Sequence, residues 1–146
     1  EVGIKPGFRV LDYGCGPGGY VSAAARMVGS SGRVYALDIH PQAIQRVRSI
    51  TGRKRLANVE TILSDCRTGL QNESVDVVLL HDTFHSLSEQ GQVLEELHRV
   101  LKPSGILSFS DHHMKESEIL PKVKGQALFG LSARGKRTYS FLKNSP

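Results

Sequence analysis

Short apolar runs alternate along this chain with segments whose apolar residues recur every three or four positions. Runs of the first kind predict buried strands, and spacing of the second kind predicts amphipathic helices. Regular alternation of the two is typical of a parallel α/β sheet. We therefore expect parallel strands at residues 8–11, 33–38, 59–63, 75–80 and 106–110.

Helices are expected between these strands, at residues 20–28, from Pro41 onward, and after residue 89. Proline is well accepted in the first turn of a helix. Ser86 and Glu89 have the spacing of a capping box and predict the start of the third helix. The apolar faces are Val21, Ala24, Ala25 and Val28; then Ile44, Val47 and Ile50; then Val93, Leu94, Leu97, Val100 and Leu101.

The last part of the chain changes character. Two short β-type runs, residues 127–132 and 138–142, flank the turn around Arg134 and Gly135 and favour a hairpin over another βαβ unit. The predicted fold is a doubly wound, mostly parallel, seven-stranded α/β sheet with a C-terminal antiparallel hairpin. With no linker in the sequence, residues 1–146 are expected to form a single domain.

Composition excludes several classes of protein. With 146 residues, 39% hydrophobic content and two cysteines, the chain is not a disulfide-rich scaffold. No apolar run is long enough for a membrane span, so a cytoplasmic domain is expected. The net charge of +5 favours anionic partners. Nucleic acid is a possible partner but is not favoured, because the sequence has no dense basic stripe with interleaved aromatic residues.

The glycine-rich run from Asp12 to Gly19 lies between the first strand and the first helix. Glycines at this place allow a tight turn and a close approach of a ligand to backbone N–H groups. Gly14, Gly16 and Gly19 also match the GxGxxG pattern of dinucleotide sites, so an NAD-dependent oxidoreductase stays an alternative.

Acidic residues follow or close four of the predicted strands. Asp12, Asp38, Asp65 and Asp82 would therefore meet at one edge of the sheet, where ligands of open α/β sheets bind. A carboxylate at the position of Asp38 can accept hydrogen bonds from both ribose hydroxyls of an adenosine. The sequence predicts a nucleoside site at this edge.

The successive runs VLDYGCGPGG, ALDIHP, LSDC, VDVVLLHDTFH and LHRVLKPSGILSFSD resemble the motifs of class I S-adenosylmethionine-dependent methyltransferases, from Val10 to Asp111. The nearest group is the ubiquinone/menaquinone-methyltransferase-like enzymes that act on small molecules. The resemblance implies a Rossmann-like fold, S-adenosyl-L-methionine as cofactor and a small-molecule methyl acceptor. Family members carry lid helices before the first strand, and we expect these to be missing from residues 1–7.

The resemblance also implies the cofactor contacts. The methionine part would be bordered by Asp12, Gly14, Gly16, Gly18 and Tyr20, with His81 near the carboxylate and the transferring methyl. The nucleoside would be held by Asp38, Ile39, Asp65 and the backbone N–H of Cys66.

Histidines at the same edge are the candidates for catalysis. A general base is needed only where the acceptor must lose a proton, and His81 and His85 are the predicted catalytic residues among His81, Asp82, His85, His112 and His113. His81, His85, Asp111 and His112 could also form a mixed nitrogen and oxygen metal site. Their spacing does not demand one, and no metal is expected.

The residues after the fourth strand narrow the class of acceptor. The run HDTF differs from the Asn/Asp-Pro-Pro-Tyr/Phe run of enzymes that methylate exocyclic amines of bases, and no Pro-Cys pair offers a nucleophile for cytosine chemistry. A small-molecule methyltransferase is thus the main hypothesis. A binding module without turnover, an RNA methyltransferase and a homo-oligomeric assembly remain open.

Overall fold

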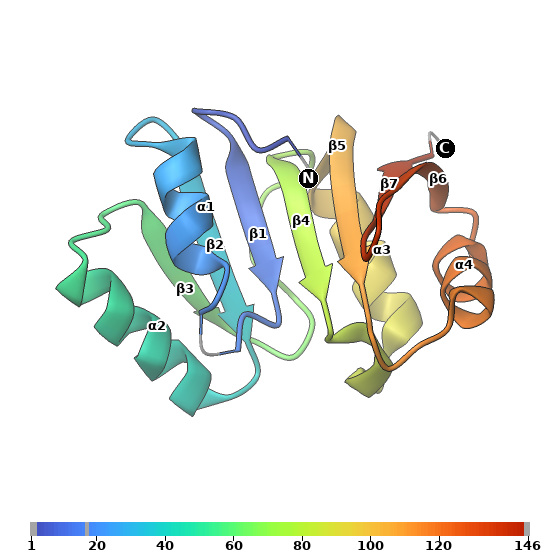
Figure 1. The fold of residues 1–146 in the computed structure, drawn as a ribbon, viewed down its shortest axis with the longest axis horizontal. Coiled ribbons are helices and arrows are strands. Elements are labelled where there is room, and N and C mark those ends of the chain that lie inside the picture. Colours follow the sequence, from blue (N-terminus) through green and yellow to red (C-terminus); the bar gives the residue numbers. More distant parts are fainter. Residues whose placement is uncertain (1–2, 17, 145–146) are drawn as a thin grey trace.

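A computed structural model describes residues 3–16 and 18–144 as one sheet flanked by helices (Figure 1). Its seven strands lie in the order β3-β2-β1-β4-β5-β7-β6. The bounds are β1 Arg9–Tyr13, β2 Arg33–Asp38, β3 Val59–Leu63, β4 Val75–His81, β5 Leu101–Ser110, β6 Phe129–Arg134 and β7 Tyr139–Lys143.

The five strands β1 to β5 pair in parallel, and β7 is antiparallel to both of its neighbours, β5 and β6. The last strand in sequence is therefore inserted between β5 and β6. This arrangement confirms the mostly parallel sheet with a C-terminal antiparallel hairpin.

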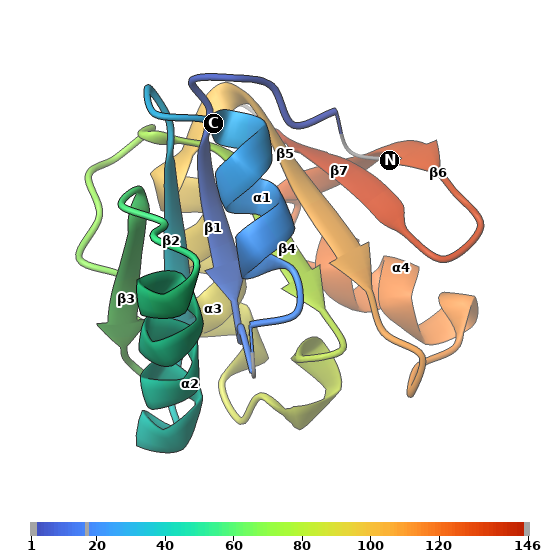
Figure 2. The same ribbon diagram turned by 60° about the vertical axis from the view of Figure 1, so that its left-hand side comes forward.

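Helices cover both faces of the sheet, which makes the fold doubly wound (Figure 2). Because side chains alternate along a strand, Val10 and Val77 pack with α1 and α2 on one face, whereas Leu11 and Val78 pack with α3 on the other. The α4 helix packs on β6 and adds to the α3 side. The bounds are α1 Val21–Val28, α2 Pro41–Arg53, α3 Gln90–Val100 and α4 Glu116–Lys124, with a 3₁₀ turn, η1, at Phe84–Ser86.

The predicted capping box at the start of α3 is wrong. Ser86 belongs to η1, and its hydroxyl donates to the carbonyl of Thr83 at 2.8 Å, while the residue before the helix is Glu89. The preceding chain forms its own turn, so Ser86 lies three residues before the observed N-cap, Glu89. Strand β5 is also longer than expected, because Leu101 already pairs with Val75.

The α4 helix was missed because Pro121 interrupts its apolar pattern. Proline removes a backbone donor and normally breaks a helix interior. The first turn is closed instead by Glu118, whose side chain accepts from the backbone N–H of Lys115 at 3.2 Å. Two buried side chains, Ile119 and Val123, fix the helix on the sheet. Within residues 3–16 and 18–144, every helix is too short or too polar to cross a bilayer.

Candidate active site

The loop after β1 is held against the end of β2 by backbone hydrogen bonds. The N–H groups of Gly14 and Cys15 both donate to the carbonyl of Leu37, at 2.8 and 2.9 Å. Asp38 continues this contact, because its Oδ2 accepts from the backbone N–H of Gly16 and its Oδ1 from that of His40, both at 2.9 Å. The carboxylate therefore helps to fix the shape of the loop.

Two of the loop glycines are required for different reasons. Gly14 has φ +77°, and a Cβ at this position would lie 2.4 Å from Oγ1 of Thr83. Gly16 has φ +54°, but a Cβ there would meet no atom within 4 Å. Gly14 thus serves internal packing, whereas the space beside Gly16 is open to a ligand.

Asp12 lies beneath this loop, at the end of β1, with 2% of its surface exposed. Burial, and then the nearby charge of Asp38, raise the pKa of Asp12 to about 7. Among the described residues, its Oδ2 has no hydrogen-bond partner. A buried carboxylate without a partner is costly, and a cationic or hydrogen-bond-donating ligand at this end of the loop would relieve that cost.

Apolar side chains are exposed along the same edge of the sheet. Ile39 and Leu63 are each 57% exposed, at the ends of β2 and β3. Beyond β3, Asp65 is exposed and Cys66 is half-buried. The backbone N–H of Cys66 donates to Oγ of Ser64 at 3.2 Å in this structure. The edge can accept a flat apolar group flanked by polar partners.

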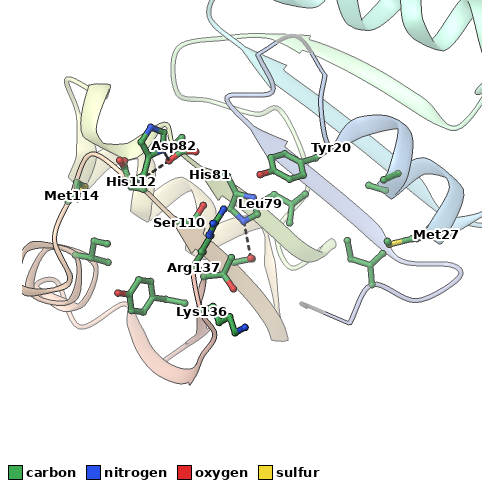
Figure 3. Close-up of a pocket in the computed structure, with 18 residues that line it drawn as sticks. Tyr20, Met27, Leu79, His81, Asp82, Ser110, His112, Met114, Lys136 and Arg137 are labelled. Carbon is green, nitrogen blue, oxygen red and sulfur yellow. Dashed lines mark hydrogen bonds and ion pairs between the residues drawn. The ribbon is translucent and has the colours of Figure 1, made fainter.

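A cavity of about 910 Å³ lies beside the loop, over β4 and β5 (Figure 3). Tyr20, 51% exposed, packs the edge of its ring against His81 at 4.9 Å between centroids. His81 in turn shares a 3.0 Å hydrogen bond between Nε2 and Oγ of Ser108. Other lining residues are apolar (Ile4, Ala23, Ala24, Met27, Leu79, Met114, Ile119), acidic (Asp82, Asp111), basic (Lys136, Arg137) or polar (Ser110, His112, Thr138, Tyr139).

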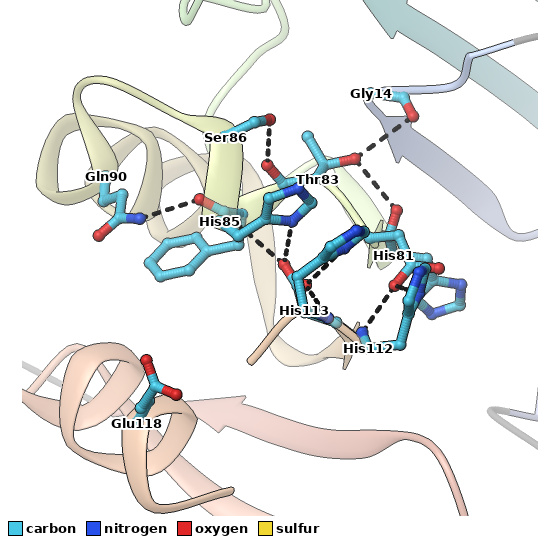
Figure 4. Close-up of polar contacts among 12 residues, drawn as sticks. Gly14, His81, Thr83, His85, Ser86, Gln90, His112, His113 and Glu118 are labelled. Atoms are coloured by element: carbon cyan, nitrogen blue, oxygen red, sulfur yellow. Dashed lines mark hydrogen bonds and ion pairs between the residues drawn. The ribbon is translucent and has the colours of Figure 1, made fainter. Parts of the chain in front are cut away.

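The two predicted catalytic histidines are placed differently. His81 lines the cavity, whereas His85 is not among its lining residues and bonds through Nδ1 to Oδ2 of Asp111 at 2.8 Å (Figure 4). The structure also changes the metal-ligating set considered from the sequence. His81 is outside both groups of donor atoms that lie close enough for a shared ion, and His113 is in both.

Asp82 has a constrained backbone and a fixed partner. Its φ is +54°, and its Oδ1 accepts from both the backbone N–H and Nδ1 of His112, at 2.8 and 2.6 Å. Burial by itself would raise the pKa of Asp82, but these hydrogen bonds and the charges of His112 and His113 lower it below the usual range.

The basic pair Lys136 and Arg137 was not among the predicted site residues. In sequence it is part of a scattered set of positive charges, without a spacing that points to a site. The hairpin between β6 and β7 brings it to the cavity wall. Only the pairing of β7 with β5 could have revealed this position.

A doubly wound sheet, a glycine loop after its first strand and acidic residues at the following strand ends are typical of nucleotide- and nucleoside-binding α/β domains. Comparison with known families narrows this class. Residues 4–141 match a family model described as a methyltransferase domain, and the chain belongs to that family. This confirms the resemblance to methyltransferases found in the sequence.

Individual relatives agree with this assignment. The chain is 34% identical over 109 residues to an arsenite methyltransferase of Halobacterium salinarum, covering 74% of this chain and 28% of that protein. It is 32% identical over 113 residues to the ubiquinone/menaquinone biosynthesis C-methyltransferase UbiE of Hydrogenovibrio crunogenus, covering 74% of this chain and 44% of the relative. The chain spans less than half the length of these two curated relatives.

A solved structure extends the similarity to nearly the whole fold. A SAM-dependent methyltransferase from Aquifex aeolicus is 28% identical and has a TM-score of 0.85, covering 97% of this chain and 84% of the other. The Rossmann-like architecture expected from the sequence is confirmed.

Proposed function

We propose that this domain binds S-adenosylmethionine along the ends of β1 and β2 and transfers its methyl group to a small molecule in the adjoining cavity. The observation that carries the proposal is Asp12. Its carboxyl group is buried below the glycine loop, with a raised pKa and an oxygen without a partner among the described residues. The cationic methionine end of the cofactor would give that oxygen the positive neighbour it needs.

The nucleoside fits the neighbouring residues. Each carboxylate oxygen can accept two hydrogen bonds, so Asp38 retains capacity for the ribose hydroxyls although it already accepts from Gly16 and His40. Exposed Ile39 offers an apolar surface to adenine. Asp65 would accept from the adenine amino group, and the N–H of Cys66 would exchange its 3.2 Å bond to Ser64 for a ring nitrogen.

Gly14, Gly16 and Gly18 all have positive φ values, a conformation that glycine adopts readily and that suits a loop whose backbone approaches a ligand. We assign Gly16 to the methionine part, because a Cβ there would meet no atom within 4 Å. Gly14 and Gly18 set the shape of the loop, because a Cβ would lie 2.4 Å from Thr83 at Gly14 and 3.2 Å from Val47 of α2 at Gly18. The backbone of Gly18 can still border the methionine part.

When bound, the cofactor supplies a methyl group on a sulfonium, and its transfer is an in-line displacement in which positioning provides much of the acceleration. Tyr20 and His81 line the cavity next to the glycine loop and would orient the reacting groups. We propose His81 as the base where the acceptor must lose a proton. His85 does not line the cavity and is bonded to Asp111, so a direct catalytic role for it has less support.

The acceptor class follows from the cavity. Apolar side chains from α1, β4 and α4 line it, and Lys136 and Arg137 add positive charge. The two acidic lining residues, Asp82 and Asp111, are paired with His112 and His85. An amphipathic small molecule with an anionic or electron-rich group fits this combination. One relative is an arsenite methyltransferase and another a C-methyltransferase of ubiquinone/menaquinone biosynthesis, which favours a small acceptor over RNA.

Calorimetric titration with S-adenosylhomocysteine, with NADH as the control ligand, tests the cofactor site. We expect one-to-one binding with a micromolar Kd and no heat from NADH. Transfer of a labelled methyl group to arsenite, quinols and amines then tests turnover. Binding of NADH in place of S-adenosylhomocysteine would overturn the assignment, and binding without transfer to any acceptor class would favour the binding module.

A further inference from the structure

Three imidazole rings lie one after another beside the cavity. The ring centroids of His85 and His113 are 4.1 Å apart, and those of His113 and His112 are also 4.1 Å apart (Figure 4). His85 comes from the turn after β4, whereas His112 and His113 follow β5. The fold thus gathers nitrogen ligands from two segments that are distant in sequence.

A buried carboxylate lies beside two of these rings and contacts both. Asp111 has no exposed side-chain surface; its Oδ2 is 2.8 Å from Nδ1 of His85, and its Oδ1 is 3.6 Å from Nδ1 of His113. The three donor atoms lie within 4.8 Å of one another. Two ligands of a tetrahedral zinc ion lie about 3.3 Å apart, because Zn–N and Zn–O distances are about 2.0–2.1 Å. Small side-chain adjustments would therefore enclose an ion.

Two backbone N–H groups also hold the carboxylate of Asp111 in place. The backbone N–H of His85 donates to Oδ2 of Asp111 at 2.9 Å, and that of His113 donates to Oδ1 at 3.0 Å. Such outer hydrogen bonds orient a carboxylate ligand. Asp111 is thereby fixed beside the two rings.

We propose that His85, Asp111 and His113 bind one divalent transition-metal ion such as Zn²⁺. Two imidazoles and one carboxylate suit zinc, cobalt, iron or nickel better than magnesium or calcium, which prefer oxygen ligands. The ion would replace the proton that His85 and Asp111 share. A second donor group, Asp82 with His112 and His113, is less favoured, because the side chains of Asp82 and His112 are 41% and 72% exposed.

The proposed metal site adjoins the cavity, and this position gives the ion a role in binding the methyl acceptor. Asp111 belongs both to this group and to the cavity wall. Three protein ligands leave a fourth position for a bound molecule, as in catalytic zinc sites. An acceptor with an oxygen, nitrogen or sulfur donor could bind the ion there and be held beside the methyl donor. This role rests on the proposed function, whereas metal binding itself does not.

The test uses the full chain without a histidine tag, stripped with a chelator and titrated with Zn²⁺ by calorimetry and with Co²⁺ by visible absorption. We expect one equivalent to bind, without the thiolate charge-transfer band that coordination by Cys66 would give. His85→Ala and His113→Ala should each weaken binding by at least about tenfold, since even outer-sphere partners of metal ligands are worth that much. Both rings are partly exposed, so these variants should fold.

The matched control is His98→Ala on α3, whose ring bonds to the carbonyl of Asn144 away from this cluster. It should keep the wild-type affinity for Zn²⁺. Unchanged affinity in His85→Ala, or loss of binding only in His112→Ala, would overturn the assigned ligands, and so would a wild-type chain that binds no equivalent of either ion. Titration of the same variants with S-adenosylhomocysteine separates a failure here from a failure of the proposed function.

Discussion

The backbone N–H of Gly16 donates to Oδ2 of Asp38 at 2.9 Å, which ties the glycine loop after β1 to the end of β2. The same carboxylate accepts from the backbone N–H of His40 through its other oxygen. The residue proposed to hold the ribose therefore also sets the position of the loop proposed to hold the methionine part. Loop shape and nucleoside binding are coupled through one side chain.

This coupling predicts a large effect of Asp38→Ala on cofactor binding. The substitution removes the ribose contacts and releases Gly16, and a hydrogen bond to a charged group is worth about 1.5–3 kcal/mol. We expect the affinity for S-adenosylhomocysteine to fall about 10- to 100-fold, measured by calorimetric titration.

The matched control is Asp76→Ala at the opposite end of the sheet. Asp76 also accepts from a backbone N–H, that of Arg9 at 2.8 Å, and from Lys102 at 2.9 Å. This variant should lose stability but retain the affinity of the folded chain for S-adenosylhomocysteine. Equal loss of affinity in the two variants would argue that Asp38 acts through general stability rather than as a ligand.

The raised pKa of Asp12 predicts that the stability of the fold decreases as pH rises. Its pKa rises from 3.8 to about 7 on folding, mainly through burial and then through Asp38. Below about pH 4 the carboxyl is protonated in both states. Between about pH 4 and pH 7 only the unfolded state loses the proton, so the free energy of unfolding falls as pH rises, by about 4 kcal/mol in total. Above pH 7 this destabilisation is complete.

Asp12→Asn should remove that fall and make the chain more stable than wild type at pH 8, as measured by urea unfolding across pH. The same variant should bind S-adenosylhomocysteine more weakly, because the negative charge facing the cofactor is lost. Exposed Asp65 provides the control, since Asp65→Asn should leave the stability profile unchanged. A parallel profile in wild type and Asp12→Asn would contradict the raised pKa.

The centre of the sheet could be predicted because β1, β2 and β4 are short, mainly apolar runs with turn residues after them. Strands β2 and β3 match their predicted bounds of 33–38 and 59–63. The placement of the strand-end aspartates at one edge followed from parallel pairing alone. Errors arose where local signals competed with tertiary contacts, as at Ser86, which forms a separate turn, and at Pro121, which lies inside a helix.

The histidine cluster could be predicted only in part. The set considered from the sequence includes His85 and Asp111 but not His113, because the geometry depends on how two loops fold. Consecutive His112 and His113 do not reveal from sequence that one pairs with Asp82 and the other approaches Asp111. His81 and His85 look equivalent as residues near the end of β4, yet one faces the cavity and the other bonds to Asp111. Spacing along a loop does not determine direction, and only the packed structure separates their roles.

Gly14→Ala should destabilise the chain much more than Gly19→Ala. At Gly14 the backbone has φ +77°, and the added methyl would lie 2.4 Å from Thr83, whereas at Gly19 nothing lies within 4 Å. A left-handed backbone costs a non-glycine residue about 1–2 kcal/mol, and the clash adds to this cost. Urea unfolding measures the difference, and Thr83→Ala in the Gly14→Ala background should restore part of it. Equal effects of the two glycine substitutions would contradict the proposed packing role of Gly14.

The pair Lys136 and Arg137 should affect the acceptor and not the cofactor. Both side chains line the cavity from the hairpin, whereas the residues proposed to hold the cofactor follow the ends of β1, β2 and β3. We expect Lys136→Ala with Arg137→Ala to leave the affinity for S-adenosylhomocysteine unchanged and to lower kcat/KM at least about tenfold for an anionic acceptor, because one charged contact is worth about 1.5–3 kcal/mol. A neutral acceptor should be affected less.

Lys124→Ala, at the end of α4 and not among the residues that line the cavity, serves as the charge-matched control. Equal loss of turnover with neutral and anionic acceptors would show that the basic pair shapes the hairpin instead of recognising charge.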